Sequence, residues 1–251
     1  MASISAIRVP VTAIGQWALD KLYPPHCPSC KKSVSAQGHL CGACFQDIHM
    51  ISAPHCAQCG VPFAVDMGED ALCPDCLDRT SSYVSARSAL VYGDVVGGLI
   101  KQLKYHDRMQ GLERYSQWMM SATQAFVSEV DVVVPVPLHW KRLMTRYYNQ
   151  AAWLAYGLGK EASIPCQPHV LKRVRHTPPQ ARLNREERQR NMKRAFIVPT
   201  TYKNLIENNR TFVVADAMTT GATIEACAEA LKSAGAAHVY AVTLARAVRN
   251  I

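Results

Sequence analysis

A short run of hydroxyl residues and one glycine, Thr219-Thr-Gly-Ala-Thr223, follows an acidic residue, Asp216, and an apolar stretch, 212–215. The apolar stretch is typical of a strand that is buried on both faces, so we expect Asp216 where the strand leaves the sheet and faces a crevice. The run that follows offers consecutive backbone N–H groups and three hydroxyls, and its glycine lets a ligand approach the backbone closely. These features together predict a binding loop for a phosphate monoester.

The residues after this loop predict a helix. Ile224, Cys227, Ala228 and Leu231 recur at helical spacing, and Gly235 supplies a stop. The free N–H groups and the positive end of the helix dipole would face an anion held by the loop. An ordinary strand, turn and helix without a ligand is the alternative interpretation.

Eight of the ten cysteines lie in four Cys-x-x-Cys pairs within residues 27–76. Four thiolates complete one tetrahedral site, so the pairs predict two structural zinc ions. Redox chemistry and disulfides are the alternatives, and the small apolar content of the segment favours metal. The predicted ligands are Cys27, Cys30, Cys41, Cys44, Cys56, Cys59, Cys73 and Cys76.

The spacing of the cysteines leaves two questions open. The pairs can combine sequentially, or interleave so that the first joins the third. His26, His39 and His55 flank the pairs and are candidates to replace a cysteine. We expect the metal module to have a core separate from that of the rest of the chain.

Positive charge is concentrated in one segment. The net charge is +9, and residues 139–194 contain 13 Lys and Arg against 3 Glu. Such a segment favours a polyanionic ligand, which could be a small pyrophosphate compound or a nucleic acid backbone; a solvated face is the remaining alternative.

The remaining patterns predict an α/β domain. Helices are expected near 97–105, 111–128 and 149–157, and strands near 83–92, 130–136, 170–174, 195–198, 212–216 and 239–244. Parallel strands that alternate with helices make a doubly wound sheet, with ligands at the carboxyl ends of the strands. The predicted domains are an amphipathic helix in 1–26, the metal module in 27–80 and the α/β domain in 81–251.

Two polar segments lie in this α/β half. One begins with Pro135-Val-Pro-Leu-His139 after a predicted strand and continues through Arg142, Arg146, Asn149 and Gln150. The other is a basic stretch that we expect to be a mobile lid, with Thr177, Gln180, Arg182, Arg188, Asn191 and Phe196.

The phosphate loop resembles the signature of type I phosphoribosyltransferases, in which apolar residues precede two acids and then Thr-Thr-Gly-x-Thr. In that family the two acids hold the ribose hydroxyls of phosphoribosyl pyrophosphate. Ala215 replaces the first acid here, whereas Asp216 matches the second. The resemblance therefore implies a phosphoribosyl ligand with a weakened grip on the ribose.

Nearly the whole chain resembles the ComF family of bacterial competence and DNA-utilisation proteins. That family joins a cysteine-rich metal module to a phosphoribosyltransferase domain. Tyr147-Tyr148 departs from the usual Gly-Phe. The residues that carry the resemblance are Tyr23–Cys30, Leu103-Lys-Tyr105, Pro135–His139, Arg146, Asn149-Gln150, Gln180, Arg188, Asn191 and Ala195-Phe196.

The resemblance implies binding of phosphoribosyl pyrophosphate, with Mg²⁺, and a role in DNA uptake or utilisation. Whether the chain is a phosphoribosyltransferase enzyme stays open because of Ala215. The expected catalytic residues are Asp216, Lys104 and Arg146. The expected ligand-binding residues are Asp216, Thr219, Thr220, Gly221, Ala222, Thr223, Lys104, Tyr105 and Arg188.

A non-catalytic module that binds single-stranded DNA or a helicase partner is the alternative function. Trp140, Tyr147 and Tyr148 lie beside basic residues and are candidates to stack on bases, although aromatics in such places are more often part of a core. No apolar run reaches the ~18 residues of a membrane span, and we expect a soluble, cytoplasmic protein.

Overall fold

The computed structural model describes residues 24–103, 111–139, 144, 148–175, 192 and 194–248. Several predicted features lie outside these residues. They are the helix in 1–26 up to residue 23, Lys104, Tyr105, Trp140, Arg142, Arg146, Tyr147, Thr177, Gln180, Arg182, Arg188 and Asn191.

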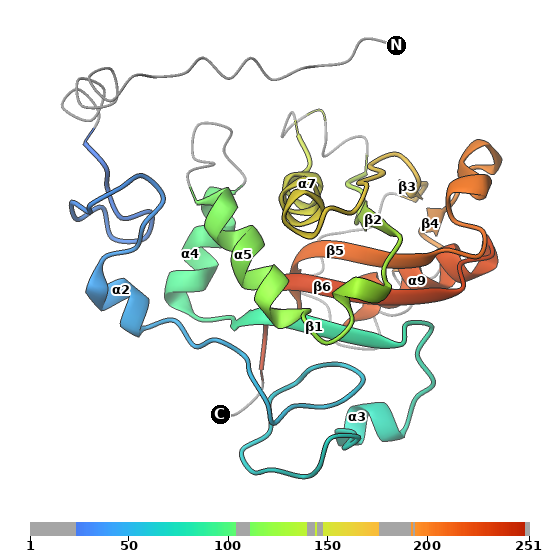
Figure 1. Ribbon diagram of the computed structural model, residues 1–251, viewed down its shortest axis with the longest axis horizontal. Coiled ribbons are helices and arrows are strands. Elements are labelled where there is room, and N and C mark those ends of the chain that lie inside the picture. The colour runs from blue at the N-terminus through green and yellow to red at the C-terminus, as the bar shows by residue number, and fades with distance from the viewer. Residues whose placement is uncertain are drawn as a thin grey trace.

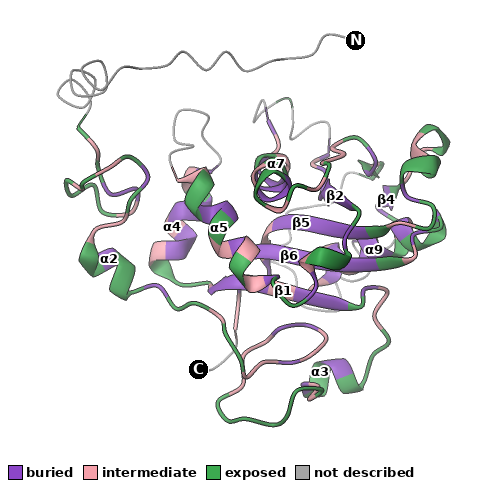
Figure 2. Cartoon of the chain, viewed as in Figure 1, coloured by how far each residue is buried: buried purple, intermediate pink, exposed green. Residues whose placement is uncertain are grey.

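The described residues form a parallel sheet of four strands in the order β1-β6-β5-β2 (Figure 1). The strands are β1 Ser85–Val91, β2 Val132–Pro135, β5 Arg210–Met218 and β6 His238–Arg246. β5 and β6 are central and almost wholly buried (Figure 2), as expected of strands that are covered on both faces.

Three helices cover one face of the sheet. They are α4 Asp94–Gln102, α5 Leu112–Ala122 and α7 Gln150–Ala162. Phe212 and Val214 of β5 point to this side and pack in one cluster with Leu99, Met119 and Leu154 from the helices. A short 3-10 helix, η2 Val127–Glu129, connects α5 to β2.

A single described helix, α9 Ala222–Ser233, covers the opposite face. The alternate residues of β5, Val213 and Ala215, share a cluster with Ile224 and Leu231 of α9. The doubly wound parallel sheet is therefore confirmed, because successive residues of the central strand bury their side chains under helices on opposite faces.

The strands expected near 170–174 and 195–198 are not part of this sheet. They are β3 Lys172–Arg173 and β4 Phe196–Ile197, which pair antiparallel as a separate two-stranded ribbon. The prediction of parallel strands was wrong here. Lys172 is exposed, and a charged residue of this kind cannot occupy a sheet that is covered on both faces. A 3-10 helix, η4 Thr200–Leu205, follows.

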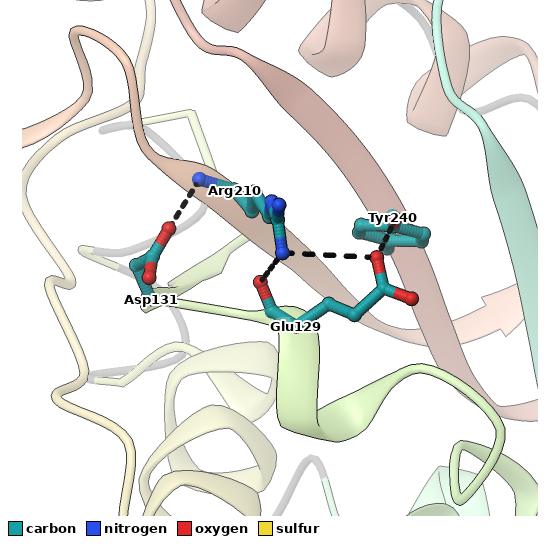
Figure 3. A network of polar contacts seen from close by, with 4 residues as sticks. All are labelled: Glu129, Asp131, Arg210 and Tyr240. Carbon is teal, nitrogen blue, oxygen red and sulfur yellow. Dashed lines mark hydrogen bonds and ion pairs between the residues drawn. The ribbon is translucent and has the colours of Figure 1, made fainter.

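A polar network fixes the amino ends of the strands (Figure 3). The backbone N–H of Arg210 donates to Asp131, at 2.8 Å, and the Tyr240 hydroxyl donates to Glu129, also at 2.8 Å. The guanidinium of Arg210 lies 3.9 Å from the Glu129 carboxylate. Burial and the contact with Glu129 raise the pKa of Tyr240. The network sets the register of β2, β5 and β6 at the end opposite to the loop 219–223.

The cysteine-rich segment 24–80 has two short helices, α2 Gly42–Gln46 and α3 Pro74–Leu77. Its central part pairs with the edge strand β1: Ile51 N–H donates to Ala89 O at 2.9 Å, and Ala86 N–H donates to Gln58 O at 2.7 Å. These bonds cover a sheet edge that would otherwise be open.

The expectation of a separate core for the metal module was wrong for its second half. Cys56, Cys59, Cys73 and Cys76 belong to the same buried cluster as α9 and the sheet. The four side chains around a bound metal are mostly carbon and sulfur, so they pack as apolar groups against the α/β domain. Cys27 and Cys44 belong to neither of the two main clusters.

Candidate phosphate loop and zinc centres

The eight predicted ligands form two groups among the described residues. In each group the four sulfur atoms lie within 4.8 Å of one another. The groups are Cys27, Cys30, Cys41 and Cys44, and Cys56, Cys59, Cys73 and Cys76. The first pair therefore combines with the second and the third with the fourth, which decides for sequential pairing.

The sulfur spacing suits zinc. A tetrahedral ion with Zn–S bonds of about 2.3 Å places sulfurs about 3.8 Å apart. The Cys59 and Cys73 sulfurs are 3.7 Å apart, and those of Cys30 and Cys41 are 3.4 Å apart. Two four-cysteine sites that fit structural zinc are thus present, and the flanking histidines belong to neither.

Backbone groups and charge prepare the second site for thiolates. The Cys56 sulfur accepts N–H bonds from Cys59 and Cys73, both at 3.4 Å. The Cys59 thiol donates a hydrogen bond to the Cys56 thiolate. This bond, together with the backbone donors, lowers the pKa of Cys56 to about 4. The same pairing and burial raise the pKa of Cys59, and the nearby charge of Arg246 offsets only part of this rise. A metal ion bound here would replace the proton that the pair shares.

The first site lies at the periphery. Cys30 is exposed, whereas Cys27 and Cys44 are buried. Its surroundings belong to α4 and α5: Gln102 donates to Pro28 O, and Arg114 lies 3.4 Å from the His39 ring. Among the described residues, the first site therefore contacts the helices of one face and lies away from the loop 219–223.

The two remaining cysteines are Cys166 and Cys227. Burial raises the pKa of Cys166 to about 12, and it also raises the pKa of the fully buried Cys227 on α9. Neither thiol belongs to a metal-binding group.

The predicted loop connects the end of a strand to the start of a helix. β5 ends at Met218 and α9 begins at Ala222, as the sequence pattern predicted. Gly221 has φ +78° and is the N-cap of α9, and a Cβ there would lie 2.9 Å from the Met218 methyl group. The left-handed backbone favours glycine at this position, whereas the Met218 methyl group is the end of a flexible side chain and can move.

One hydroxyl of the loop has no partner among the described residues. Thr220 Oγ1 is buried without a hydrogen bond to any of them, and so is Thr211 Oγ1 at the opposite end of β5. A buried polar group without a partner costs stability, so its retention beside a cavity is typical of ligand contact. Thr219 is exposed, and Thr223 is half-buried in the first turn of α9.

A cavity of about 250 Å³ adjoins this loop. It lies between the loop, the chain that follows α3 and the second four-cysteine site. Its lining residues are Cys59, Asp75, Cys76, Arg79, Thr80, Ser81, Tyr83, Met218, Thr219, Thr220, Gly221, Ala222, Glu225, Glu229 and Arg246.

Asp216 and Thr223 do not line this cavity. Asp216 is half-buried near the end of β5, and its carboxylate accepts the N–H of Ala217 at 2.8 Å. Ala215 is only 5% exposed and packs in the cluster beneath α9. The missing acid is thus replaced by a small side chain that belongs to the apolar core.

The Pro-Val-Pro-Leu-His segment is held by the residues that follow it. Asn149 is the N-cap of α7: its side chain accepts from Ala151 N–H at 3.1 Å and donates to Val136 O at 3.0 Å. The hydroxyl of buried Tyr148 donates to Leu103 O at 2.7 Å, directly before Lys104. The suggestion that Tyr148 stacks on bases was therefore wrong. Gln150 is buried, and its Nε2 has no hydrogen-bond partner within residues 24–103, 111–139, 144, 148–175, 192 and 194–248.

Sequence reasoning missed Arg79, Tyr83 and Arg246 as lining residues. Arg246 is the last residue of β6 and pairs with Met218 in the register. The rule that placed Asp216 near the carboxyl end of a strand applies equally to Arg246. Arg79 and Tyr83 carry no local signal, because the fold of the metal module brings them to the loop.

Comparison with known proteins adds the following. Residues 18–77 match the family model of the double zinc ribbon domain. The chain is 28% identical over 227 residues to "Competence protein F" of Haemophilus influenzae, covering 88% of this chain and 96% of that one. It is 28% identical over 213 residues to "DNA utilization protein YhgH" of Salmonella typhi, covering 82% and 90%. The resemblance to the ComF family is confirmed over most of the chain.

One solved structure that is similar is a glutamine phosphoribosylpyrophosphate amidotransferase from B. subtilis, in complex with ADP and GMP. The TM-score is 0.38 at 19% identity, over 57% of this chain and 30% of that one. At this score the likeness adds nothing to the fold assignment, which rests on the strand order. None of the helices in the described part of the chain has the length and apolarity needed to cross a bilayer.

Proposed function

We propose that this chain, a relative of competence protein F and the DNA utilization proteins that carries a double zinc ribbon, binds a phosphoribosyl group and serves DNA uptake or utilisation. The ligand class is phosphoribosyl pyrophosphate or a related sugar phosphate. The observation that carries the proposal is the loop 219–222, where Gly221 with φ +78° begins α9 beside the unpartnered hydroxyl of Thr220. A helix start of this kind, with a spare donor, supports a phosphate.

The proposed roles follow from position and charge. The loop 219–223 holds the 5-phosphate through its N–H groups and hydroxyls. Asp216 holds the ribose hydroxyls or a water bound to Mg²⁺, whose charge would neutralise the pyrophosphate. Lys104, Tyr105, Arg146 and Arg188, which lie outside the described residues, are proposed to contact the pyrophosphate.

If transfer takes place, the bond between the ribose C1 and the pyrophosphate oxygen breaks, and its electron pair leaves with pyrophosphate. A nitrogen of the acceptor base then forms the new bond at C1. Cationic side chains stabilise the charge that develops on the leaving group, and they act most strongly where water is excluded. With Ala215 in place of an acid, we expect weak ribose binding and slow transfer or none.

Calorimetry tests this proposal directly. The full-length, zinc-loaded chain is titrated with phosphoribosyl pyrophosphate in the presence of Mg²⁺, with ribose 5-phosphate and pyrophosphate as separate ligands. Saturable binding of about one ligand per chain supports the site, and an assay of pyrophosphate release over a set of bases then tests turnover. Absence of binding for all three ligands would refute it.

A second candidate function, the binding of single-stranded nucleic acid, draws on the basic segment. Within it, the described residues Lys160, Lys172, Arg175 and Arg194 are exposed. The two functions differ in salt dependence: binding along a phosphate backbone weakens steeply with log[salt], whereas a small sugar phosphate in a preformed site responds less. A salt titration with a labelled oligonucleotide therefore separates them.

A further inference from the structure

We infer that the second zinc ribbon, residues 56–76, forms one wall of the anion site, and that Arg246 couples metal in this ribbon to anion binding at the loop 219–222. The ligand class rests on the proposed function, whereas the coupling of ribbon and loop does not. The first ribbon, residues 27–44, takes no part in it.

Arg246 contacts both the second ribbon and the residue that precedes the loop. Its guanidinium donates to the backbone carbonyl of Cys59, a ligand of the second site, and lies 3.7 Å from the sulfur of Met218, at the end of β5. Only 8% of its surface is exposed, and its Nε has no hydrogen-bond partner in the part of the chain that the structure describes. Arg246 lines the cavity together with Thr220, whose hydroxyl is also without a partner. Two residues that line the cavity thus each contain a buried polar atom without a hydrogen-bond partner among the described residues.

A second contact joins the ribbon to the loop from the other side. The chain that leaves α3 passes over the first turn of α9, where Ser82 N–H donates to the Glu225 carboxylate at 2.7 Å. Tyr83 follows, and its hydroxyl lies 3.9 Å from the position of a Cβ on Gly221. The loop is therefore contacted by Arg246, which is bonded to the second ribbon, and by the chain that leaves this ribbon.

The acidic residues that line the cavity make anion binding dependent on the cations that the second ribbon positions. Asp75, Glu225 and Glu229 line it as well, so an anion meets repulsion that Arg79 and Arg246 must offset. Arg79 lies two residues after the end of α3, and Arg246 is oriented by its hydrogen bond to the Cys59 carbonyl. Both cations depend on the folded second ribbon for their position. Loss of its metal would release them, and binding at the loop would weaken.

The two four-cysteine sites provide a matched pair of variants in the full-length chain. Cys73→Ser with Cys76→Ser removes the second site, and Cys41→Ser with Cys44→Ser removes the first. Each variant retains one zinc equivalent, which elemental analysis verifies. The two readouts are hydrogen exchange of residues 218–222, which needs no ligand, and calorimetry with inorganic pyrophosphate and phosphoribosyl pyrophosphate.

We expect the second-site variant to lose exchange protection at 218–222 and to bind roughly tenfold more weakly or worse, within the range of ordinary coupling between sites. The first-site variant should keep both properties. Equal effects of the two variants, or unchanged exchange and affinity in the second-site variant, would overturn the inference. If the parent chain binds neither ligand, the proposed function fails, while the exchange comparison still decides the coupling.

Arg246→Gln covers the case in which the second-site variant does not fold. It keeps both zinc sites, and we expect faster exchange at 218–222 and weaker binding. Arg87→Gln is the control, because Arg87 also lies beside the second site, with its guanidinium bonded to Ala57 O at 3.0 Å, but does not line the cavity. If Arg246→Gln behaves as Arg87→Gln does in exchange and binding, the role of Arg246 is refuted.

Discussion

The guanidinium of Arg246 donates a hydrogen bond to the backbone carbonyl of Cys59, so the end of the central strand β6 is tied to a ligand of the second zinc site. The two residues are far apart in sequence, and the bond is buried. The first site has no such connection to the described strands, since its contacts are with Gln102 and Arg114 of the helices. Two similar metal sites therefore serve different structural purposes in one chain.

Two zinc ions per chain are expected, because each group of four sulfurs has the spacing of a tetrahedral site. Elemental analysis of protein purified without chelator should find about two equivalents. A ratio near zero, with all eight thiols titratable in the native state, would contradict the assignment.

Zinc affinity should fall as the pH falls. Without metal, burial raises the pKa of Cys44 and of Cys76 to about 12, so both thiols carry protons at neutral pH. Zinc binds the thiolate and releases these protons, so the apparent affinity drops about tenfold per released proton for each pH unit lowered. Competition with a chromophoric chelator at pH 6 and pH 8 measures this, and equal affinity at both would refute it.

Thr220→Val should weaken ligand binding without loss of stability. The Thr220 hydroxyl is buried and unpaired, so its removal costs the folded state nothing, but a phosphate loses one hydrogen bond of about 0.5–1.5 kcal/mol. Affinity should fall about 2- to 12-fold in calorimetry, with Tm unchanged or raised.

Thr211→Val is the matched control for that variant. It removes a buried threonine hydroxyl of β5 that has no hydrogen-bond partner among the described residues, at the end of the strand remote from the loop. Binding should stay as in the parent chain. If both variants bind equally well, the hydroxyl of Thr220 does not contact the ligand.

Asp216→Asn should weaken binding of phosphoribosyl pyrophosphate with Mg²⁺ while the fold is kept. The amide oxygen still accepts the N–H of Ala217, but the charged acceptor for a ribose hydroxyl is lost, at a cost of about 1.5–3 kcal/mol. Calorimetry should show a loss of about ten- to a hundredfold. Pyrophosphate alone should bind unchanged, and a parallel loss for it would assign Asp216 another role.

Ala215→Asp should destabilise the protein at neutral pH. Ala215 is buried in the cluster beneath α9, where desolvation raises a carboxyl pKa by several units, so stability falls by roughly 3 kcal/mol or more. A carboxyl with a raised folded-state pKa loses stability as the pH rises above its unfolded value, so the deficit should shrink below about pH 4.

Thermal unfolding at pH 4 and pH 7 measures that difference. If the variant is as stable as its parent at pH 7 and binds phosphoribosyl pyrophosphate more tightly, the carboxylate at position 215 is not buried in the core, and the prediction is wrong. The new carboxylate would then reach the ribose as the first acid of the signature does.

The sequence alone determined the features that depend on local spacing. Two cysteines three residues apart can reach one ion in any fold, so the ligands Cys27 to Cys76 followed from the pattern alone. The loop 219–223 was equally predictable, since an apolar strand, a glycine and a helical repeat fix the order strand, turn and helix. The parallel sheet followed from the alternation of these elements along the chain.

Tertiary structure alone decided what depends on contacts between distant segments. It joined the cysteine pairs sequentially and excluded β3 and β4 from the parallel sheet. It also buried the cysteines of the second ribbon in the core between the sheet and α9. It also brought Arg246 and Arg79 to the loop 219–222. Local spacing states which groups can bind a metal or an anion, but the packing of apolar surface between remote segments decides which of those groups meet.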